Sequence, residues 1–482
     1  MRPLTVLAIA CLYLTSLAAA KEVTIHGFVT DVKSASSFTI DDYIITRDQK
    51  ITLDLSAPEG DKTPPAFTPE DIRVGTELEV KGELDEASGE LKAKSVKVFF
   101  DNTHRIRRTA LLEQLPALSQ KESSWEGTIH ADGQTIAVAP TTIVTIKPNI
   151  SEQKDQHGNK DKEKYKDENL EGVKLTSLDS LNLDTFLHYE GMRQPDGTIK
   201  ADKVEFEHGE VENGEAKMLK HLEPKVKDPD YFAPAPGELK MHWKKYKIVP
   251  NKEAQDYISN LGESLVPEHQ KEMPADDPLK ISFRFYLVQA KVFNAAAYPN
   301  GVVVVHSADF DILQNEAQLA FVMAHEISHA VEKHAWEIHQ YYRKELLALR
   351  LSGAFIPFGG GIATGLTASA IQNRYIRTLE NQADRVGLEW MLAAGYDIRE
   401  APASWKALAI KKDDDVDVNP FWSTHDNYTT RRSYLMSELK NNYSTVDYSK
   451  LKKDSDEFHR VAALVKEAEA SQKKRPSSSP AQ

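Results

Sequence analysis

The chain has 482 residues, of which 40% are hydrophobic and 28% charged, and its formal net charge is −13. This length predicts several domains, and the composition is that of a globular protein rather than a membrane-embedded or disordered one. The acidic balance argues against a general nucleic-acid binder, which needs basic patches to pair with phosphates.

Residues 1–20 have the pattern of a signal peptide. Arg2 supplies a positive charge, the apolar run 4–17 follows, and small residues precede Lys21. This run is too short for an ordinary transmembrane helix, so we expect a periplasmic or extracellular protein; an uncleaved membrane anchor is the alternative. Because Cys11 is the only cysteine, the mature chain would have no disulfide and would build any metal site from His and carboxylates.

Residues 21–210 consist of short runs with alternating polarity, separated by Gly, Asp and Pro, which predicts β-strands. The pattern occurs twice, since 197–204 aligns with 89–96 without a gap. We expect two tandem, small all-β, barrel-like repeats at 21–120 and 121–210, such as oligonucleotide/oligosaccharide-binding barrels. Their role could be docking, including contact with a membrane surface or an envelope protein, or substrate presentation; inert structural padding is the alternative.

Two polar stretches accompany these repeats. The run 152–168 is highly charged, and we expect a solvated insertion rather than a binding patch. Residues 211–245 are expected to be a linker, because 228–237 contains three prolines and a glycine.

We expect residues 246–450 to form one mainly helical α+β domain. The stretch 252–265 has the pattern of an amphipathic helix, and 281–288 and 302–306 have the pattern of strands. An exposed edge of this small sheet could bind an extended peptide by strand addition, although the strands could equally be core alone.

The most specific motif is His325-Glu326-x-x-His329, inside a helical pattern that begins after Asn315 and extends beyond His334. Asn315 is a good N-cap, and Gln318 completes a capping-box pattern. Histidines four residues apart lie on one face of a helix and can bind one zinc ion, with Glu326 beside them as general base. We expect His334 and His339 to be surface or supporting residues, because a catalytic zinc takes three protein ligands.

Glu380 is the best candidate for the third ligand. It lies in a second helical pattern, and Asp384 follows four residues later on the same face. Asp384 could accept the other ring N–H of a ligand histidine and so fix its orientation. Two solvated carboxylates on an exposed helix are the alternative.

The combination of His325-Glu326-x-x-His329 with Glu380-x-x-x-Asp384 resembles the gluzincin metallopeptidases of the HtpX, CAAX-prenyl-protease and BepA type (metallopeptidase family forty-eight). The resemblance covers roughly 245–440 and implies a zincin domain with one Zn²⁺ per chain. It also includes Ser423-Thr424-His425 and Arg431, although Asp426 stands where the family has proline. It implies that His425 donates to the developing oxyanion or gates the open zinc position, and that Arg431 pairs with a carboxylate near the site.

The remaining stretches bear on location more than on chemistry. The uncharged run 353–371 is long enough to span a membrane, but its Gly, Pro, Ser and Thr content favours a loop with a lid helix. The tail 451–482 is expected to be helical and then disordered.

These patterns predict a zinc-dependent endopeptidase that acts on proteins or peptides, and the family resemblance implies a role in protein quality control outside the cytoplasm. The alternatives are an exported chaperone or binding protein with a structural zinc site, and a zinc hydrolase of another substrate class. The intact Glu326 argues against a structural site, which needs no general base. The sequence leaves the oligomeric state open.

Overall fold

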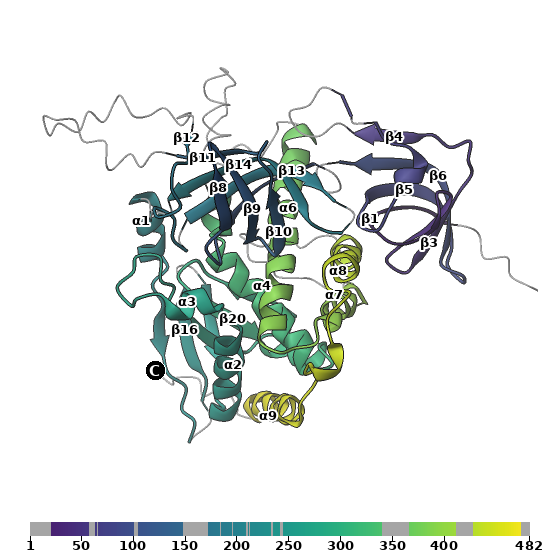
Figure 1. Cartoon of the computed structure of the whole chain (residues 1–482). Coiled ribbons are helices and arrows are strands. Elements are labelled where there is room, and N and C mark those ends of the chain that lie inside the picture. The colour runs from purple at the N-terminus through teal and green to yellow at the C-terminus, as the bar shows by residue number, and fades with distance from the viewer. Residues whose placement is uncertain are drawn as a thin grey trace, which may run out of the picture.

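The computed structural model describes residues 21–56, 63–64, 66–100, 105–147, 172–183, 185–194, 196–208, 211, 213–232, 235–241, 244–339, 366–410 and 428–473. The expected signal peptide with Cys11, the insertion 152–168, the run 353–365 and His425 lie outside these residues. Figure 1 shows two β-rich regions beside a group of helices that pack on a third, smaller sheet.

The first β region is a closed barrel of five strands. Neighbouring strands pair in the order β3-β2-β1-β5-β6, and β3 pairs with β6 to close the ring, while β4 continues along β6. A bulge at Gly82 brings β5 so close to β6 that a Cβ there would lie 2.2 Å from the Lys92 carbonyl oxygen. Its strands are β1 (Lys21–Ser34), β2 (Ser37–Ile40), β3 (Tyr43–Arg47), β4 (Leu53–Ser56), β5 (Glu77–Asp85) and β6 (Glu90–Phe99), with the short helix η1 (Pro69–Asp71) before β5. The barrel expected for the first unit is therefore confirmed.

The second β region has a similar order of pairings. Strand β14 runs antiparallel to β13 and parallel to β10 and β11, as β6 does to β5, β3 and β4. A bulge at Gly191 corresponds to the one at Gly82. Strand β7 lies within the expected first unit but pairs with β13 of this second sheet. The strands are β7 (Arg105–Leu111), β8 (Ala117–Lys121), β9 (Ser124–Ala131), β10 (Gln134–Val138), β11 (Ile143–Ile146), β12 (Val173–Lys174), β13 (Thr185–Arg193) and β14 (Ile199–His208).

The third sheet begins inside the stretch expected to be a linker. Residues 211–245 contain α1 (Asn213–His221), β15 (Lys225–Lys227), β16 (Gly237–Met241) and the start of β17 (Lys244–Ile248). Asp230 and Ala235 bridge across the turn between β15 and β16, so Pro229 and Pro236 lie in a hairpin connection rather than in an extended linker. The sheet continues through β18 (Arg284–Val288) and β20 (Val302–His306) to β19 (Ala295–Ala297) at its edge.

Helices cover this sheet and share its hydrophobic core. The expected helix at 252–265 is confirmed as α2 (Lys252–Leu265), and the strand at 302–306 as β20. The other helices are α3 (Glu268–Glu272), η2 (Ser307–Asp311), α4 (Glu316–Val331), α6 (Leu366–Ala393), η3 (Ile398–Glu400), α7 (Ala401–Ile410), α8 (Tyr428–Asn442), η4 (Tyr448–Lys450) and α9 (Asp456–Lys473). Among the described residues, no helix combines the length and the apolar character needed to cross a membrane.

Helix α4 begins as the sequence predicts but ends earlier. The Asn315 side chain accepts a hydrogen bond from the Gln318 N–H, which confirms the N-cap. The Gln318 side chain accepts from the Gln314 N–H rather than from the N-cap residue, so the predicted capping box is not formed as expected. The helix stops at Val331 because Lys333 has a left-handed backbone (φ 54°), and helical structure resumes over 334–339.

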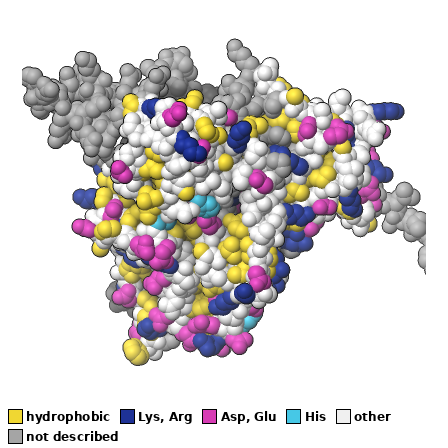
Figure 2. Space-filling model, viewed as in Figure 1, with side chains coloured by type: hydrophobic (Ala, Val, Ile, Leu, Met, Phe, Trp, Pro, Cys, Tyr) yellow, Lys and Arg dark blue, Asp and Glu magenta, His cyan; other side chains and the backbone are white. Residues whose placement is uncertain are grey.

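The first barrel contacts α8 through its strand β1 and the turn after β2. The Phe28 N–H donates to Ser433 Oγ at 2.9 Å, and a Cβ at Gly27 would lie 2.6 Å from the same oxygen. Arg432 pairs with both Asp41 and Asp42. Figure 1 shows the barrel beside α8, and Figure 2 shows acidic and basic side chains interspersed over the visible face.

Candidate metal centre

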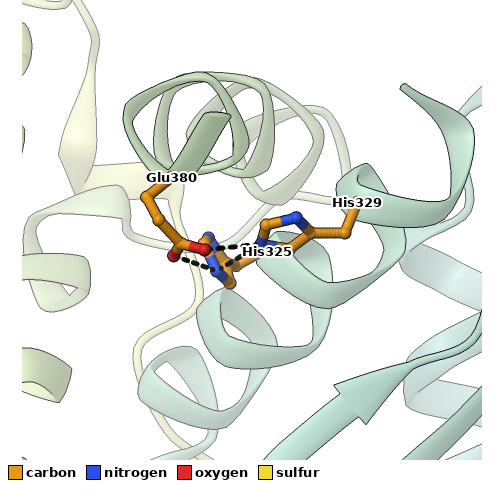
Figure 3. A group of neighbouring side chains, drawn as sticks. All are labelled: His325, His329 and Glu380. Carbon is orange, nitrogen blue, oxygen red and sulfur yellow. Dashed lines mark hydrogen bonds and ion pairs between the residues drawn. The ribbon is translucent and has the colours of Figure 1, made fainter. Parts of the chain in front are cut away.

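Three side chains from two helices converge at the centre of the helical region. His325 and His329 are one turn apart on α4, and Glu380 reaches them from α6, as Figure 3 shows. Glu380 carboxylate oxygens lie 3.5 Å from His325 Nε2 and 3.6 Å from His329 Nε2. One potential ligand atom from each residue lies within 4.8 Å of the other two, and all three residues are buried. Two imidazole nitrogens and a carboxylate form a donor set suited to a catalytic Zn²⁺.

Asp384 orients His325. Its Oδ1 lies 3.2 Å from His325 Nδ1, so that nitrogen donates its N–H to the carboxylate, and Nε2 is the nitrogen turned toward Glu380 and His329. Burial and the Arg431 charge act to lower the pKa of His325, but hydrogen bonds to Asp384 and Glu380 outweigh them and raise it to about 9. The imidazole therefore loses a proton when it binds a metal.

Arg431 of α8 joins both carboxylates. It donates to Asp384 from Nε at 3.0 Å and from Nη2 at 2.6 Å, and its Nη1 lies 3.0 Å from Glu380 Oε2. Its guanidinium carbon lies 3.6 Å from the centre of the Trp405 ring. Burial acts to raise the pKa of Asp384, but the charges of Arg431 and His325 lower it overall, so this carboxylate is ionised.

His329 is oriented by a different set of residues. Its Nδ1 lies 2.8 Å from Nδ1 of His334, and His334 Nε2 lies 3.2 Å from Gln382 Oε1. His334 is fully buried, and burial lowers its pKa to about 4, whereas His339 is exposed. Both histidines were expected to be surface or supporting residues; His334 is the supporting one.

Glu326 faces the edge strand of the third sheet. Its Oε2 accepts the Ala297 N–H at 2.9 Å, and its side chain is buried beside the two histidines. Strand β19 is the last strand of its sheet and all three of its alanines are buried, whereas β15 at the opposite edge is exposed, so peptide binding at an edge of this sheet stays a prediction. A cavity of about 240 Å³ lies next to the turn that follows β19; its lining includes Pro299, Asn300, Lys333 and Trp336.

The structure thus brings together six of the seven predicted site residues, while His425 lies outside the described residues. Sequence reasoning did not assign roles to Gln382 or Trp405. Gln382 is a polar residue that lies between Glu380 and Asp384 in the sequence. This position was the one sequence feature that could have indicated a role for Gln382 at the site. Trp405 contacts both Arg431 and the His325 ring, which no local pattern reveals.

Comparisons with known proteins match two parts of the chain. Residues 252–438 match the model of peptidase family M48, and residues 26–97 match a domain of unknown function, DUF5666. The beta-barrel assembly-enhancing protease of Escherichia coli (strain K12) is 33% identical over 162 residues, and the mitochondrial metalloendopeptidase OMA1 of Bos taurus is 30% identical over 168 residues. Each match covers 32% of this chain and 32% of the relative. The chain therefore spans about a third of the length of these curated relatives.

Proposed function

Residues 252–438 of this chain are a domain of peptidase family M48, and on this premise we propose that the protein is a zinc-dependent endopeptidase. The convergence of His325, His329 and Glu380 beside Glu326 carries the proposal. The two histidines would present Nε2 and Glu380 a carboxylate oxygen to a single Zn²⁺. A zinc ion bound there would polarise the scissile carbonyl and make a water molecule acidic enough to attack it near neutral pH.

The side chains around the ligands would supply the remaining chemistry. Glu326 would take a proton from the attacking water and deliver it to the leaving amine, because Glu380 would bind the metal and Asp384 is held by His325 and Arg431. Asp384 would hold His325 with Nε2 directed at the metal, and Arg431 would hold Asp384 and Glu380 in place. From the family resemblance, we also propose that His425 donates to the developing oxyanion or gates the site.

We propose a protein or peptide substrate and a role in protein quality control outside the cytoplasm. The names of the relatives support this, since one is described as assisting the assembly of β-barrels and another as a metalloendopeptidase. The signal-like pattern at 1–20 supports export. The shared order of strand pairings supports a further proposal, that the second β region repeats the first.

The decisive experiment is the cleavage of an unfolded protein such as casein by the purified chain. We expect cleavage that a chelator abolishes and that added Zn²⁺ restores. A protein that binds zinc but leaves casein and other unfolded proteins intact would instead be the exported binding protein with a structural zinc site. Cleavage that continues after complete removal of the metal would contradict the proposed chemistry.

A further inference from the structure

We propose that the second β region helps to position a metal ligand. Its strand β7 sets the orientation of His329 through the positioning residues Gln382 and His334. This inference rests on the proposed function, in which His329 binds the metal. It assigns to the β region a role in the chemistry itself rather than in docking or spacing.

The direction of each hydrogen bond follows from one carbonyl group of β7. Gln382 Nε2 donates to the Thr109 carbonyl oxygen at 3.0 Å and to Glu332 Oε2 at 3.2 Å. A backbone carbonyl can only accept, so the Gln382 amide is oriented with Oε1 toward His334. His334 Nε2 must therefore carry the proton and donate to Gln382 Oε1 at 3.2 Å.

The proton on His334 in turn determines how His329 is hydrogen-bonded. His334 is fully buried, and a second proton would place an unpaired charge inside the protein, so the ring carries one proton, on Nε2, and its Nδ1 accepts. His329 Nδ1, at 2.8 Å, must then be the donor. With its Nδ1 bound to His334, His329 presents Nε2, the atom that faces Glu380 and His325 Nε2. A carbonyl on β7 thus fixes which nitrogen His329 offers to a metal ion.

A break in the helix makes this contact possible. On a continuous α-helix, residues five apart lie well over 90° apart around the axis and their rings do not meet. The left-handed backbone of Lys333 follows the end of α4 and changes the direction of the chain. His334 can therefore contact His329. The Lys333 side chain pairs with Glu215 of α1 and lies over the Phe186 ring of β13. A non-glycine residue in this conformation costs on the order of 1 kcal/mol, which the surrounding contacts must offset.

The interface around this path is buried and polar. The Leu111 N–H of β7 donates to Glu332 Oε2 at 3.1 Å, the same oxygen that accepts from Gln382. Further along α6, the buried Arg385 pairs with Asp132 of the turn between β9 and β10. Buried hydrogen bonds of this kind hold groups in one arrangement, because breaking them leaves polar atoms without partners. The β region is therefore held against the helix that carries Glu380.

The test compares two variants of α6 in the full-length protein. Gln382→Met keeps the size of the side chain but removes the hydrogen bonds of Gln382 to Thr109, Glu332 and His334. Glu389→Gln is the matched control: it lies on the same helix and interface, contacts His130 of β9 at 2.7 Å, and has no hydrogen bond to the path among the described residues. Zinc affinity is measured by competition with a chelator, and amide hydrogen exchange of the β7 peptide is measured with and without Zn²⁺.

We expect Gln382→Met to bind zinc 10–100-fold more weakly than the wild type, and Glu389→Gln to bind it as the wild type does. Zinc binding and the hydrogen bonds of β7 should stabilise each other, because coupling between two sites is reciprocal. Zn²⁺ should therefore slow hydrogen exchange of the Leu111 amide in the wild type by up to about 10–100-fold, and this slowing should vanish in Gln382→Met. Equal zinc affinity of Gln382→Met and wild type, or no effect of zinc on β7 exchange, would overturn the inference. A wild-type protein that binds no zinc would instead refute the proposed function. The exchange measurement on the wild type decides the matter even if Gln382→Met does not fold.

Discussion

The substitution Asp384→Asn tests how the site prepares a ligand for the metal. Asp384 accepts three contacts at once, from His325 Nδ1 at 3.2 Å and from Arg431 Nε and Nη2 at 3.0 and 2.6 Å. An asparagine has a single acceptor oxygen and an NH₂ group that can only donate. The variant must therefore give up either the contact to His325 or part of the contact to Arg431. Changes of this kind cost 10–100-fold in metal affinity, or about 1.4–2.8 kcal/mol.

The assay is zinc affinity by competition with a chelator at a fixed pH, with thermal unfolding as a second readout. Asp397→Asn is the control, since Asp397 also receives two nitrogens of one arginine, Arg399 Nε at 2.9 Å and Nη2 at 2.6 Å, but has no contact with the ligands among the described residues. Zinc affinity should fall in Asp384→Asn and stay unchanged in Asp397→Asn. If Asp384→Asn bound zinc like the wild type, Asp384 would not orient His325.

Three other substitutions test separate parts of the account. Glu380→Ala should lower the zinc content of the purified protein, and full occupancy would show that another residue is the third ligand. Burial and the Glu389 charge raise the pKa of Glu113 to about 8, above the ordinary 4.5, so wild-type stability should fall as the pH rises between these values. Glu113→Gln keeps an acceptor for Trp390 Nε1 and should unfold at a higher temperature than the wild type at pH 9 but not at pH 4; equal differences at both pH values would contradict the raised pKa. Gly27→Val places atoms where Ser433 Oγ and Ile40 lie within 2.7 Å of a Cβ, and should cost about 1–3 kcal/mol of stability in urea unfolding; an unchanged midpoint would show that barrel and α8 separate freely.

The local patterns of the chain predict much of the helical domain. The boundaries of α2 and β20 and the N-cap Asn315 follow from periodicity and capping, which depend on neighbouring residues. The convergence of His325, His329 and Glu380 was predictable because zinc chemistry requires a third ligand and few segments offer one.

What the sequence did not predict depends on contacts between distant segments. The helical pattern continues past Lys333, but the chain breaks there because Glu332 and His334 gain partners on β7 and α6. The prolines of 228–237 suit a hairpin turn as well as a linker, and only pairing with other strands of the sheet distinguishes the two. Strand β7 likewise belongs to the second sheet because of its pairing with β13, which no local pattern shows.

The central claim is that Glu326 acts as the general base of a zinc peptidase, and one comparison tests it directly. Glu326→Gln keeps the shape of the side chain and an acceptor for the Ala297 N–H but removes the basic carboxylate. Zinc content and casein cleavage are measured on the same preparations of wild type and variant. We predict one zinc per chain in both, with cleavage lost in the variant by at least about 100-fold. A variant that holds zinc and still cleaves at the wild-type rate would contradict the account.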